Sequence, residues 1–582
     1  MRVTGDRVAA VVMGAVTFAA LVPVARIDFD RHHDGYMLAQ AIAVHGGDAI
    51  QRDAFAQYGP VTPWLQSLAL FLPIGPALSL RLLNVALISL SVFLMADFGH
   101  VAPTSWPWGR WTGFWAAGTW VVLADVWLGV AMLPWSSVLA GTLTIAMLYA
   151  AAASVRHAQL GQERPALIGA TVAGVCAGLL PFTRLNVGLA SLAVMAVVAV
   201  SLFRGSTGLR RAVLIRAAVS TLSATAVVIS VLVVTRSLGP FVQQSIIWPI
   251  AWGQGATDQW KTSENLGRIF GTVAVPVALC LLVFPVRHLV RRLSSAAGRP
   301  LMLIAYAYTI AVGLYLVESL APGSLSSPLG LAGTWRERVA LLTSVLSRMS
   351  VQYLSFILCL SVTLAFIVAL GFVARSASTR TLHRPALAWL ALAGLTVAGF
   401  TQVVPTWDVR HVWWGAPIGL VLVFSVIERR GRINVPQGNQ LMFVVAAATV
   451  MAVSCRTAYL AFPRVPGPEG TIIVGMYQPA DAAQAIAEDT RLLHDNLVSG
   501  QRAVFLVYDG DISVLSGSYD SIDASFVDWG PVPELASRLD ENPRIVVPAV
   551  SGQPDPLEVA RALGYVVAAR DARLAVLAPS GQ

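Results

Sequence analysis

Residues 8–36 read VAAVVMGAVTFAALVPVARIDFDRHHDGY, and the fold depends on the change of composition within this stretch. Val8–Val24 is an apolar run, and a helix needs about 20 mostly apolar residues, with a range of roughly 17–25, to cross a bilayer. The residues after Pro23 form a poor signal-peptide cleavage site, so we expect this helix to be retained. Three carboxylates and two histidines follow directly. The stretch therefore predicts a membrane-spanning helix that opens into a polar loop at the membrane surface.

The apolar pattern recurs along all 582 residues, of which 56% are hydrophobic and only 12% charged. Soluble globular proteins carry about 25% charged residues, so the composition excludes an ordinary soluble enzyme, a disordered chain and a disulfide-stapled secreted domain. We expect a polytopic α-helical membrane protein with about 13 transmembrane helices. The predicted spans are Val8–Val24, Ala77–Phe98, Thr112–Leu128, Ser136–Ala153, Ala166–Phe182, Val187–Phe203, Ala217–Val234, Ile269–Val286, Leu301–Leu320, Tyr353–Ala374, Ala386–Val404, Ala416–Ile427 and Leu441–Phe462.

Charge divides the chain and predicts its orientation. Residues 1–462 hold 32 basic and 15 acidic residues, a net +17, whereas residues 463–582 hold 8 and 16, a net −8. Arginines gather in alternate short loops, and such loops face the cytoplasm. This places the N-terminus in the cytoplasm and, with an odd number of spans, the C-terminal domain outside. The basic residues form no single surface stripe, so we expect no nucleic-acid partner.

The sequence predicts three parts. Residues 1–462 form the transmembrane domain, with long outer loops at 25–63, 235–268 and 321–352. The Pro- and Gly-rich residues 463–470 are expected to be a linker. Residues 471–582 are expected to form a small α/β domain, because helix-like and strand-like segments alternate there. Predicted elements outside the spans are helices Gly35–Val44, Pro63–Leu72, Ala480–Val498, Val532–Leu539 and Pro556–Leu563, and strands Ala503–Tyr508, Arg544–Val547, Tyr565–Ala569 and Leu574–Leu577.

The polar run after the first span is the strongest candidate for chemistry. Carboxylates next to lipid are costly without a partner or a task, and one held near a hydroxyl can act as a general base. A carboxylate with a histidine, such as Asp34 with His33, could instead bind a divalent cation, although the sequence makes no cofactor certain. The alternative is a solvated loop anchored by Arg26 and Arg31.

Three short motifs follow one another in this region: Asp34-Gly35-Tyr36, Tyr58-Gly59-Pro60 and Arg81-Leu82. In this order they resemble the GT-C superfamily of integral-membrane glycosyltransferases, whose members use polyprenyl-phosphate or related lipid donors. The resemblance covers residues 26–84 and implies that the catalytic aspartate is Asp34. The acidic pair that is common in that superfamily stands here as His33-Asp34, so Asp30 and Asp28 remain alternatives for the base.

Further candidate site residues accompany these motifs. Arg410 and His411 resemble a late Arg-Tyr segment and would bind the donor phosphate, whose negative charge grows as the sugar bond breaks. Arg184 could contact the same phosphate or extend to the interface, and Arg410 could simply pair with Asp408. Asp125 and Asp53 are candidates for holding the acceptor or a second acidic position; the alternative for Asp125 is a hydrated helix end.

The resemblance implies an inverting transfer of sugar from a polyprenyl-phosphate donor to a glycan, lipid or protein hydroxyl at the outer membrane face. One alternative is a transporter or lipid flippase, which would need charged or interrupted helices at mid-membrane. The other is a non-catalytic scaffold whose outer domain binds a partner. That alternative leaves the carboxylates of residues 28–34 unexplained.

Overall fold

The computed structural model divides the chain into two compact units, which we describe separately. The first holds Met1–Trp106, Gly129–Gly255 and Val453–Gln582, and the second holds Pro107–Leu128 and Ala256–Ala452. The structure describes residues 5–103, 112–125, 133–203, 208–250, 384–403, 409–429, 464–497, 503–505, 512–515, 523–524, 544–548 and 564–580.

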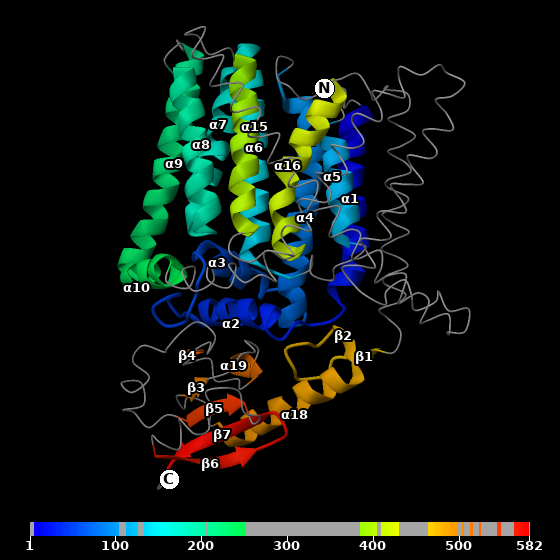
Figure 1. The fold of residues 1–582 in the computed structure, drawn as a ribbon, viewed down its shortest axis with the longest axis vertical. Helices are drawn as coiled ribbons and strands as arrows, with labels where there is room; N and C mark the ends of the chain where they lie inside the picture. The colour runs from blue at the N-terminus through cyan, green and yellow to red at the C-terminus, as the bar shows by residue number, and fades with distance from the viewer. Residues whose placement is uncertain are drawn as a thin grey trace, which may run out of the picture. The chain divides into compact units, whose positions relative to one another are not determined.

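Long apolar helices run side by side in the first unit (Figure 1). Five helices of the described residues are long and apolar enough to cross a membrane: Arg7–Ala25, Pro76–Val101, Ser136–Gln159, Glu163–Phe182 and Leu209–Val234. The chain is therefore a helical membrane protein. The helices are α1 (Gly5–Ala25), α4 (Pro76–Val101), α6 (Ser136–Gln159), α7 (Glu163–Leu179, continued by the 3-10 turn Leu180–Phe182), α8 (Leu185–Phe203) and α9 (Leu209–Val234).

Glycines let α7 and α9 approach closely. A Cβ at Gly174 would lie 2.3 Å from the carbonyl oxygen of Ala217, and one at Gly178 would lie 2.5 Å from that of Thr221. Two glycines four residues apart remove side-chain bulk from one helix face, which is a common way for membrane helices to pack. The packing of this helix pair therefore depends on residues that carry no side chain.

Two helices of the loop between α1 and α4, which the sequence predicts as the first outer loop, lie across the ends of the long helices (Figure 1). They are α2 (His33–Gly46) and α3 (Val61–Ala69), which confirm the predicted helices Gly35–Val44 and Pro63–Leu72. Most of α2 is buried, and its chain turns at Gly47 with φ +103°, a backbone conformation that favours glycine. After α3, Phe71 is 74% exposed, so this segment presents an apolar surface where the membrane interface is expected.

The second outer loop contacts the first through buried amides. The loop begins with α10 (Leu238–Val242) and the π-helical turn Gln243–Ile247. The side chain of Gln51 donates to the hydroxyl of Ser245 at 3.1 Å, and Gln244 donates back to the carbonyl of Gln51 at 2.8 Å. These contacts fix the part of the first outer loop that precedes α3.

The described part of the second unit holds α5 (Thr112–Asp125), α15 (Arg384–Phe400), the 3-10 turn Thr401–Val403 and α16 (Val409–Arg429). Trp120 and Trp413 stack with their ring centroids 4.6 Å apart, and each indole donates to the backbone carbonyl of the other residue. Gly399 and Gly415 bring α15 and α16 together, because a Cβ on either would lie 2.6 Å from the other's carbonyl oxygen.

Each predicted span with residues in the described part of the chain is helical there. The predicted span Ala416–Ile427 lies within α16, which begins further toward the N-terminus, at Val409. The predicted spans Ile269–Val286, Leu301–Leu320, Tyr353–Ala374 and Leu441–Phe462, and the predicted outer loop at 321–352, lie outside the described residues.

The C-terminal region contains a mixed sheet with strand order β4-β3-β5-β7-β6. Strand β3 runs parallel to both β4 and β5, whereas β7 is antiparallel to β5 and β6. The predicted helices Val532–Leu539 and Pro556–Leu563 lie outside the described residues. The elements are α18 (Ala480–Asn496), β3 (Ala503–Phe505), α19 (Ile512–Leu515), β4 (Asp523–Ala524), β5 (Arg544–Pro548), β6 (Tyr565–Arg570) and β7 (Leu574–Pro579).

The segment 463–470 is the one that the sequence predicted as a linker. It contains strand β1 (Arg464–Pro466), which pairs with β2 (Tyr477–Pro479) in an antiparallel two-stranded sheet. Proline cannot donate a ladder hydrogen bond, but it is tolerated in edge strands. The Pro- and Gly-rich composition of residues 463–470 gives no indication of this short strand.

Candidate functional site

Asp34 lies in the first turn of α2 and is only 2% exposed. Arg81, in the second turn of α4, donates to both of its carboxylate oxygens, with Nε 3.1 Å from Oδ1 and Nη2 on Oδ2. The same guanidinium donates to the backbone carbonyls of Ile27 and Asp28. Burial raises the pKa of Asp34 above its ordinary value, and the charge of Arg81 opposes that shift. The pair fastens the first outer loop to α4.

Asp30 is more accessible, with 31% of its side chain exposed. Its carboxylate accepts a hydrogen bond from the backbone N–H of His33 at 2.8 Å, and it lies 3.1 Å from Nδ1 of the same residue. The backbone N–H of Asp30 in turn donates to Oδ2 of Asp34 at 2.8 Å. Asp30 therefore supports the start of α2, where backbone N–H groups favour negative charge.

Asp28 adopts a left-handed backbone conformation with φ +53°. The guanidinium of Arg464 donates to both of its carboxylate oxygens, at 2.8 and 2.7 Å. The three aspartates of the loop thus have different surroundings. One is buried against Arg81, one is held by the C-terminal region, and one faces a histidine.

Aromatic rings continue from His33 into the protein. Its ring centroid lies 5.2 Å from that of Trp135, which precedes α6. The ring of Trp135 also contacts Tyr36 at 5.8 Å and Tyr58 at 5.3 Å. We call Tyr36, Tyr58 and Trp135 the aromatic array. Such edge and tilted contacts are the favourable geometries between rings.

Arg184 lies at the other end of the aromatic array. Its guanidinium carbon is 4.9 Å from the ring centroid of Tyr58, and it donates to the hydroxyl of Ser137. The residue is 6% exposed, so it does not extend outward to the interface, which was one of the two roles considered for it. The structure therefore connects Asp30, through His33 and the rings of Trp135 and Tyr58, to a buried arginine.

Gly59 explains why the Tyr58-Gly59-Pro60 motif contains a glycine. A Cβ at Gly59 would lie 1.8 Å from the carbonyl oxygen of Phe182 and 2.2 Å from its carbonyl carbon. Phe182 closes the 3-10 turn just before Arg184. Only a residue without a side chain allows the two backbones to touch and places Tyr58 against the arginine. The N–H of Gln57 donates to the hydroxyl of Tyr36 at 2.9 Å and fixes the same stretch.

The remaining predicted site residues are Asp53 in the first unit and Asp125, Arg410 and His411 in the second. Asp53 pairs with Arg52 and accepts from the backbone N–H of Ala49 at 2.8 Å, and the hydrogen bonds from Arg52 lower the pKa of its carboxyl. His411 contacts the ring of Trp414 at 5.2 Å within the second unit. Asp125 ends α5 and Arg410 opens α16, but their side chains lie outside the described residues.

The residues near Asp34 do not fit a metal site. Both oxygens of Asp34 bind Arg81, and the imidazole of His33 contacts Asp30 instead. Among the described residues, no group of three or more His, Cys, Asp or Glu side chains could hold an ion. We therefore derive no step that requires a metal.

The sequence pattern does not reveal the roles of Arg81, Trp135 and Ser137. Arg81 stands in the Arg81-Leu82 motif, and an arginine near the end of an apolar helix usually signals a partner. Trp135 and Ser137 gave no signal of this kind, because tryptophan at a helix end is common in membrane proteins.

No protein-family profile matches the chain, and no curated protein matches it. Among solved structures, the chain is similar to ArnT from Cupriavidus metallidurans bound to undecaprenyl phosphate, at 14% identity and a TM-score of 0.41, over 100% of this chain and 99% of that one. The apo structure of that protein gives the same identity and TM-score over 98% and 97%. A likeness at these values does not establish a shared fold.

Proposed function

We propose that the chain is a membrane glycosyltransferase. It takes a sugar from a polyprenyl-phosphate donor and transfers it to a hydroxyl of a glycan, lipid or protein on the outer face. The proposal rests on the residues of the chain and their geometry, and on the motif resemblance of residues 26–84.

One observation carries the proposal: an accessible carboxylate and a buried arginine lie at opposite ends of one aromatic array. Asp30 contacts His33, the ring of His33 contacts Trp135, and Tyr58 lies between Trp135 and Arg184. Transfer from a lipid phosphate needs a base for the acceptor and a cation for the leaving group, separated by the sugar. Aromatic faces between them suit the apolar side of a pyranose or furanose ring.

The chemistry follows from these positions. The carboxylate takes the proton of the acceptor hydroxyl, and the acceptor oxygen attacks the anomeric carbon. The bond between that carbon and the phosphate oxygen breaks, and the polyprenyl phosphate leaves with the electron pair. Arginine stabilises the growing negative charge on the phosphate. A single displacement inverts the anomeric centre.

Within this proposal, we assign the base to Asp30 and a positioning role to Asp34. A general base must reach the proton that it removes. Asp30 retains 31% exposure of its side chain, whereas that of Asp34 is 3% exposed and bound to Arg81. For the phosphate, Arg184 is the described candidate, and Arg410 with His411 remains a second one from the resemblance.

The test is a transfer assay with purified protein and soluble, short-chain polyprenyl-phosphate sugars, hexoses and pentoses in parallel. Release of polyprenyl phosphate and gain of mass by the acceptor are both measured. Asp30→Asn should lower transfer by about 10²–10⁴-fold, the usual scale for a general base. Arg184→Gln should weaken donor use more than Arg184→Lys, because lysine keeps the charge.

Asp48→Asn is the matched control, since Asp48 is a partly buried aspartate of the same loop outside the proposed array. Its transfer rate should stay near that of the unchanged protein. Near-normal transfer by Asp30→Asn would return the base to Asp34 or Asp28. No transfer from any lipid-linked sugar by the unchanged protein would contradict the proposed function.

A further inference from the structure

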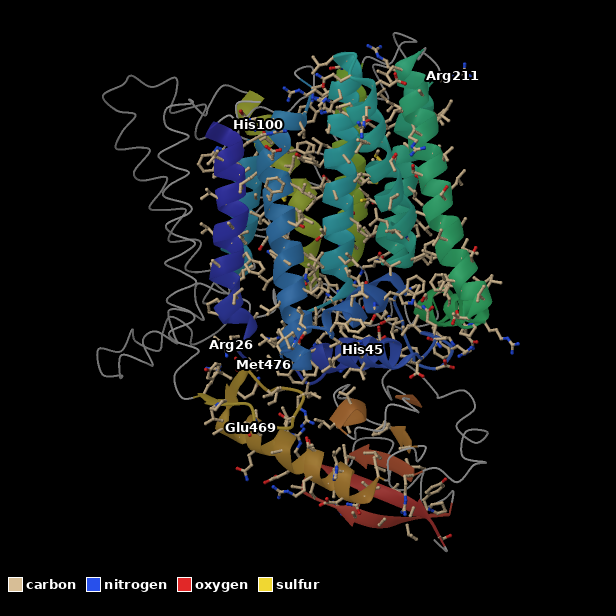
Figure 2. All side chains as sticks on the ribbon, turned by 180° about the vertical axis from the view of Figure 1, so that it is seen from behind. Arg26, His45, His100, Arg211, Glu469 and Met476 are labelled. Carbon is tan, nitrogen blue, oxygen red and sulfur yellow. The ribbon has the colours of Figure 1, made fainter. Side chains whose placement is uncertain are left out.

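The backbone of the acidic loop is joined to the C-terminal region. The N–H of Asp28 donates to the carbonyl of Tyr477 at 3.0 Å, and the N–H of Tyr477 donates to the carbonyl of Arg26 at 2.6 Å. Ile27 and Tyr477 form a parallel β-bridge, so the loop extends the sheet of β1 and β2. Nε of Arg26 also donates to the carbonyl of Gly475 at 3.0 Å, and Figure 2 shows Arg26 beside Met476.

Two ion pairs to the C-terminal region flank Asp30. On one side, Asp28 binds Arg464 in the bidentate contact described above. On the other, Arg31 lies 2.7 Å from Oδ2 of Asp489, a residue of α18 that is fully buried. The partners are more than 400 residues apart in sequence, as the 436 positions between Asp28 and Arg464 illustrate. Asp28 and Arg31, on either side of the proposed base in sequence, are therefore both held by the C-terminal region.

The same region also contacts α4, which carries Arg81. The N–H of Ala77 donates to the carbonyl of Ile472 at 3.3 Å. A Cβ at Gly75 would lie 2.1 Å from the carbonyl oxygen of Val474, so the two backbones touch where α4 begins. The C-terminal region thus contacts the two segments that bring Asp34 and Arg81 together. These are the loop that leads into α2, which carries Asp34, and the start of α4, which carries Arg81.

We propose that the C-terminal domain positions the catalytic loop of the transmembrane domain, and that Arg31, Asp489, Asp28 and Arg464 are its positioning residues. We call these two ion pairs the tail–loop clamp. The inference rests on the proposed function, because it assigns the clamp the task of holding Asp30 toward the acceptor. The clamp itself does not touch substrate. A carboxylate displaced by about 1 Å can cost on the order of 10²-fold in rate.

The test uses the full-length protein and Arg31→Gln, which removes the charge on the loop side and substitutes no residue of the C-terminal domain. Hydrogen exchange of the amides at 28–34 is measured alongside transfer. We expect exchange to quicken at least tenfold and kcat to fall about 10- to 100-fold. The KM for the soluble short-chain donor should stay within about twofold, because the proposed phosphate site is untouched.

Arg31→Lys keeps the charge and should restore most of kcat, which a loss of packing alone would not. Arg31→Gln/Asp489→Asn should be no slower than Asp489→Asn alone, because Asp489→Asn already removes the contact with Arg31, together with the 3.8 Å contact of Asp489 with Arg573. Asp495→Asn is the matched control, because Asp495 is an exposed aspartate of the same helix α18. It should change neither exchange nor kcat.

The experiment distinguishes failure of the tail–loop clamp from failure of the proposed function. Unchanged exchange at 28–34 in Arg31→Gln would overturn the clamp, and so would an equal fall of kcat in Asp495→Asn. Absence of transfer in the unchanged protein would overturn the proposed function and, with it, the catalytic task of the clamp. Quickened exchange in Arg31→Gln together with a lower kcat and an unchanged KM supports the inference.

Discussion

Asp34 and Arg81 form a buried ion pair between residues 47 positions apart. Two charges taken out of water interact favourably only when their remaining donors and acceptors are also satisfied. Here the guanidinium also donates to the carbonyls of Ile27 and Asp28, and Asp34 accepts from the N–H of Asp30. Both residues therefore fix the loop that carries the proposed base.

The first prediction is that Asp34→Asn destabilises the protein. Removing one half of a buried pair leaves the other charge uncompensated and costs about 3–5 kcal/mol. Thermal unfolding in detergent should show a clearly lower midpoint. Asp34→Leu/Arg81→Met should be milder than Asp34→Asn, because no unpaired charge remains. A normal midpoint for Asp34→Asn, combined with a loss of transfer, would instead identify Asp34 as the base.

The second prediction concerns Gly59. In Gly59→Ala the methyl group meets backbone atoms of Phe182, which have little freedom to move. The loop must shift, and Tyr58 then moves away from Arg184. We expect donor binding to weaken by at least tenfold, measured as the KM for a short-chain polyprenyl-phosphate sugar.

Gly46→Ala is the control for this variant. Gly46 lies in α2, and a Cβ there would meet nothing within 4 Å. Alanine in a helix is favoured over glycine by roughly 0.5–1 kcal/mol, so this variant should be neutral or slightly more stable. Equal donor KM values for the two glycine variants would show that the contact of Gly59 with Phe182 has no part in donor binding.

At the scale of elements, the sequence predicted the helices well because lipid imposes one rule on all of them. A spanning segment must satisfy its backbone hydrogen bonds internally and present apolar side chains. Val8–Val24, for example, corresponds to α1 (Gly5–Ala25), and Ala77–Phe98 corresponds to α4 (Pro76–Val101). Strands β1 and β2 were not predicted from the sequence. A three-residue strand depends on the strand it pairs with, and local composition does not reveal that pairing.

The third prediction belongs to α16, whose first turn contains Arg410. If Arg410 binds donor phosphate, Arg410→Ala should raise the donor KM strongly and Arg410→Lys should be intermediate, because lysine keeps the charge but loses the bidentate grip. If it only pairs with Asp408, the double variant Asp408→Ala/Arg410→Ala should be milder than Arg410→Ala. Steady-state kinetics of the three variants decide between the two roles.

At the scale of the molecule, the candidate site could be predicted only in part. The acidic run was visible because carboxylates next to an apolar helix are rare. The partners of the acidic run could not be predicted. Arg81, Arg184 and Asp489 lie far from it in sequence and come close to the loop only in the folded protein. The choice between Asp30 and Asp34 depends on burial, which the composition of the loop does not contain.

The last prediction is topological and follows from the whole chain. The tail–loop clamp places the C-terminal domain on the same side of the membrane as residues 26–31. Figure 2 shows Arg26 and His45 at one end of the long helices and His100 and Arg211 at the other. Arginines around residue 211 predict that this second end faces the cytoplasm.

A reporter that is active only in the cytoplasm should therefore stay silent when it is fused after Gln582. The same reporter inserted at residue 206, between α8 and α9, should be active. Since the clamp ties the C-terminal domain to the acidic loop, one fusion reports the side of both. A strong signal after Gln582 would place Asp30 on the cytoplasmic face. An acceptor outside the cell would then be out of reach of the proposed base.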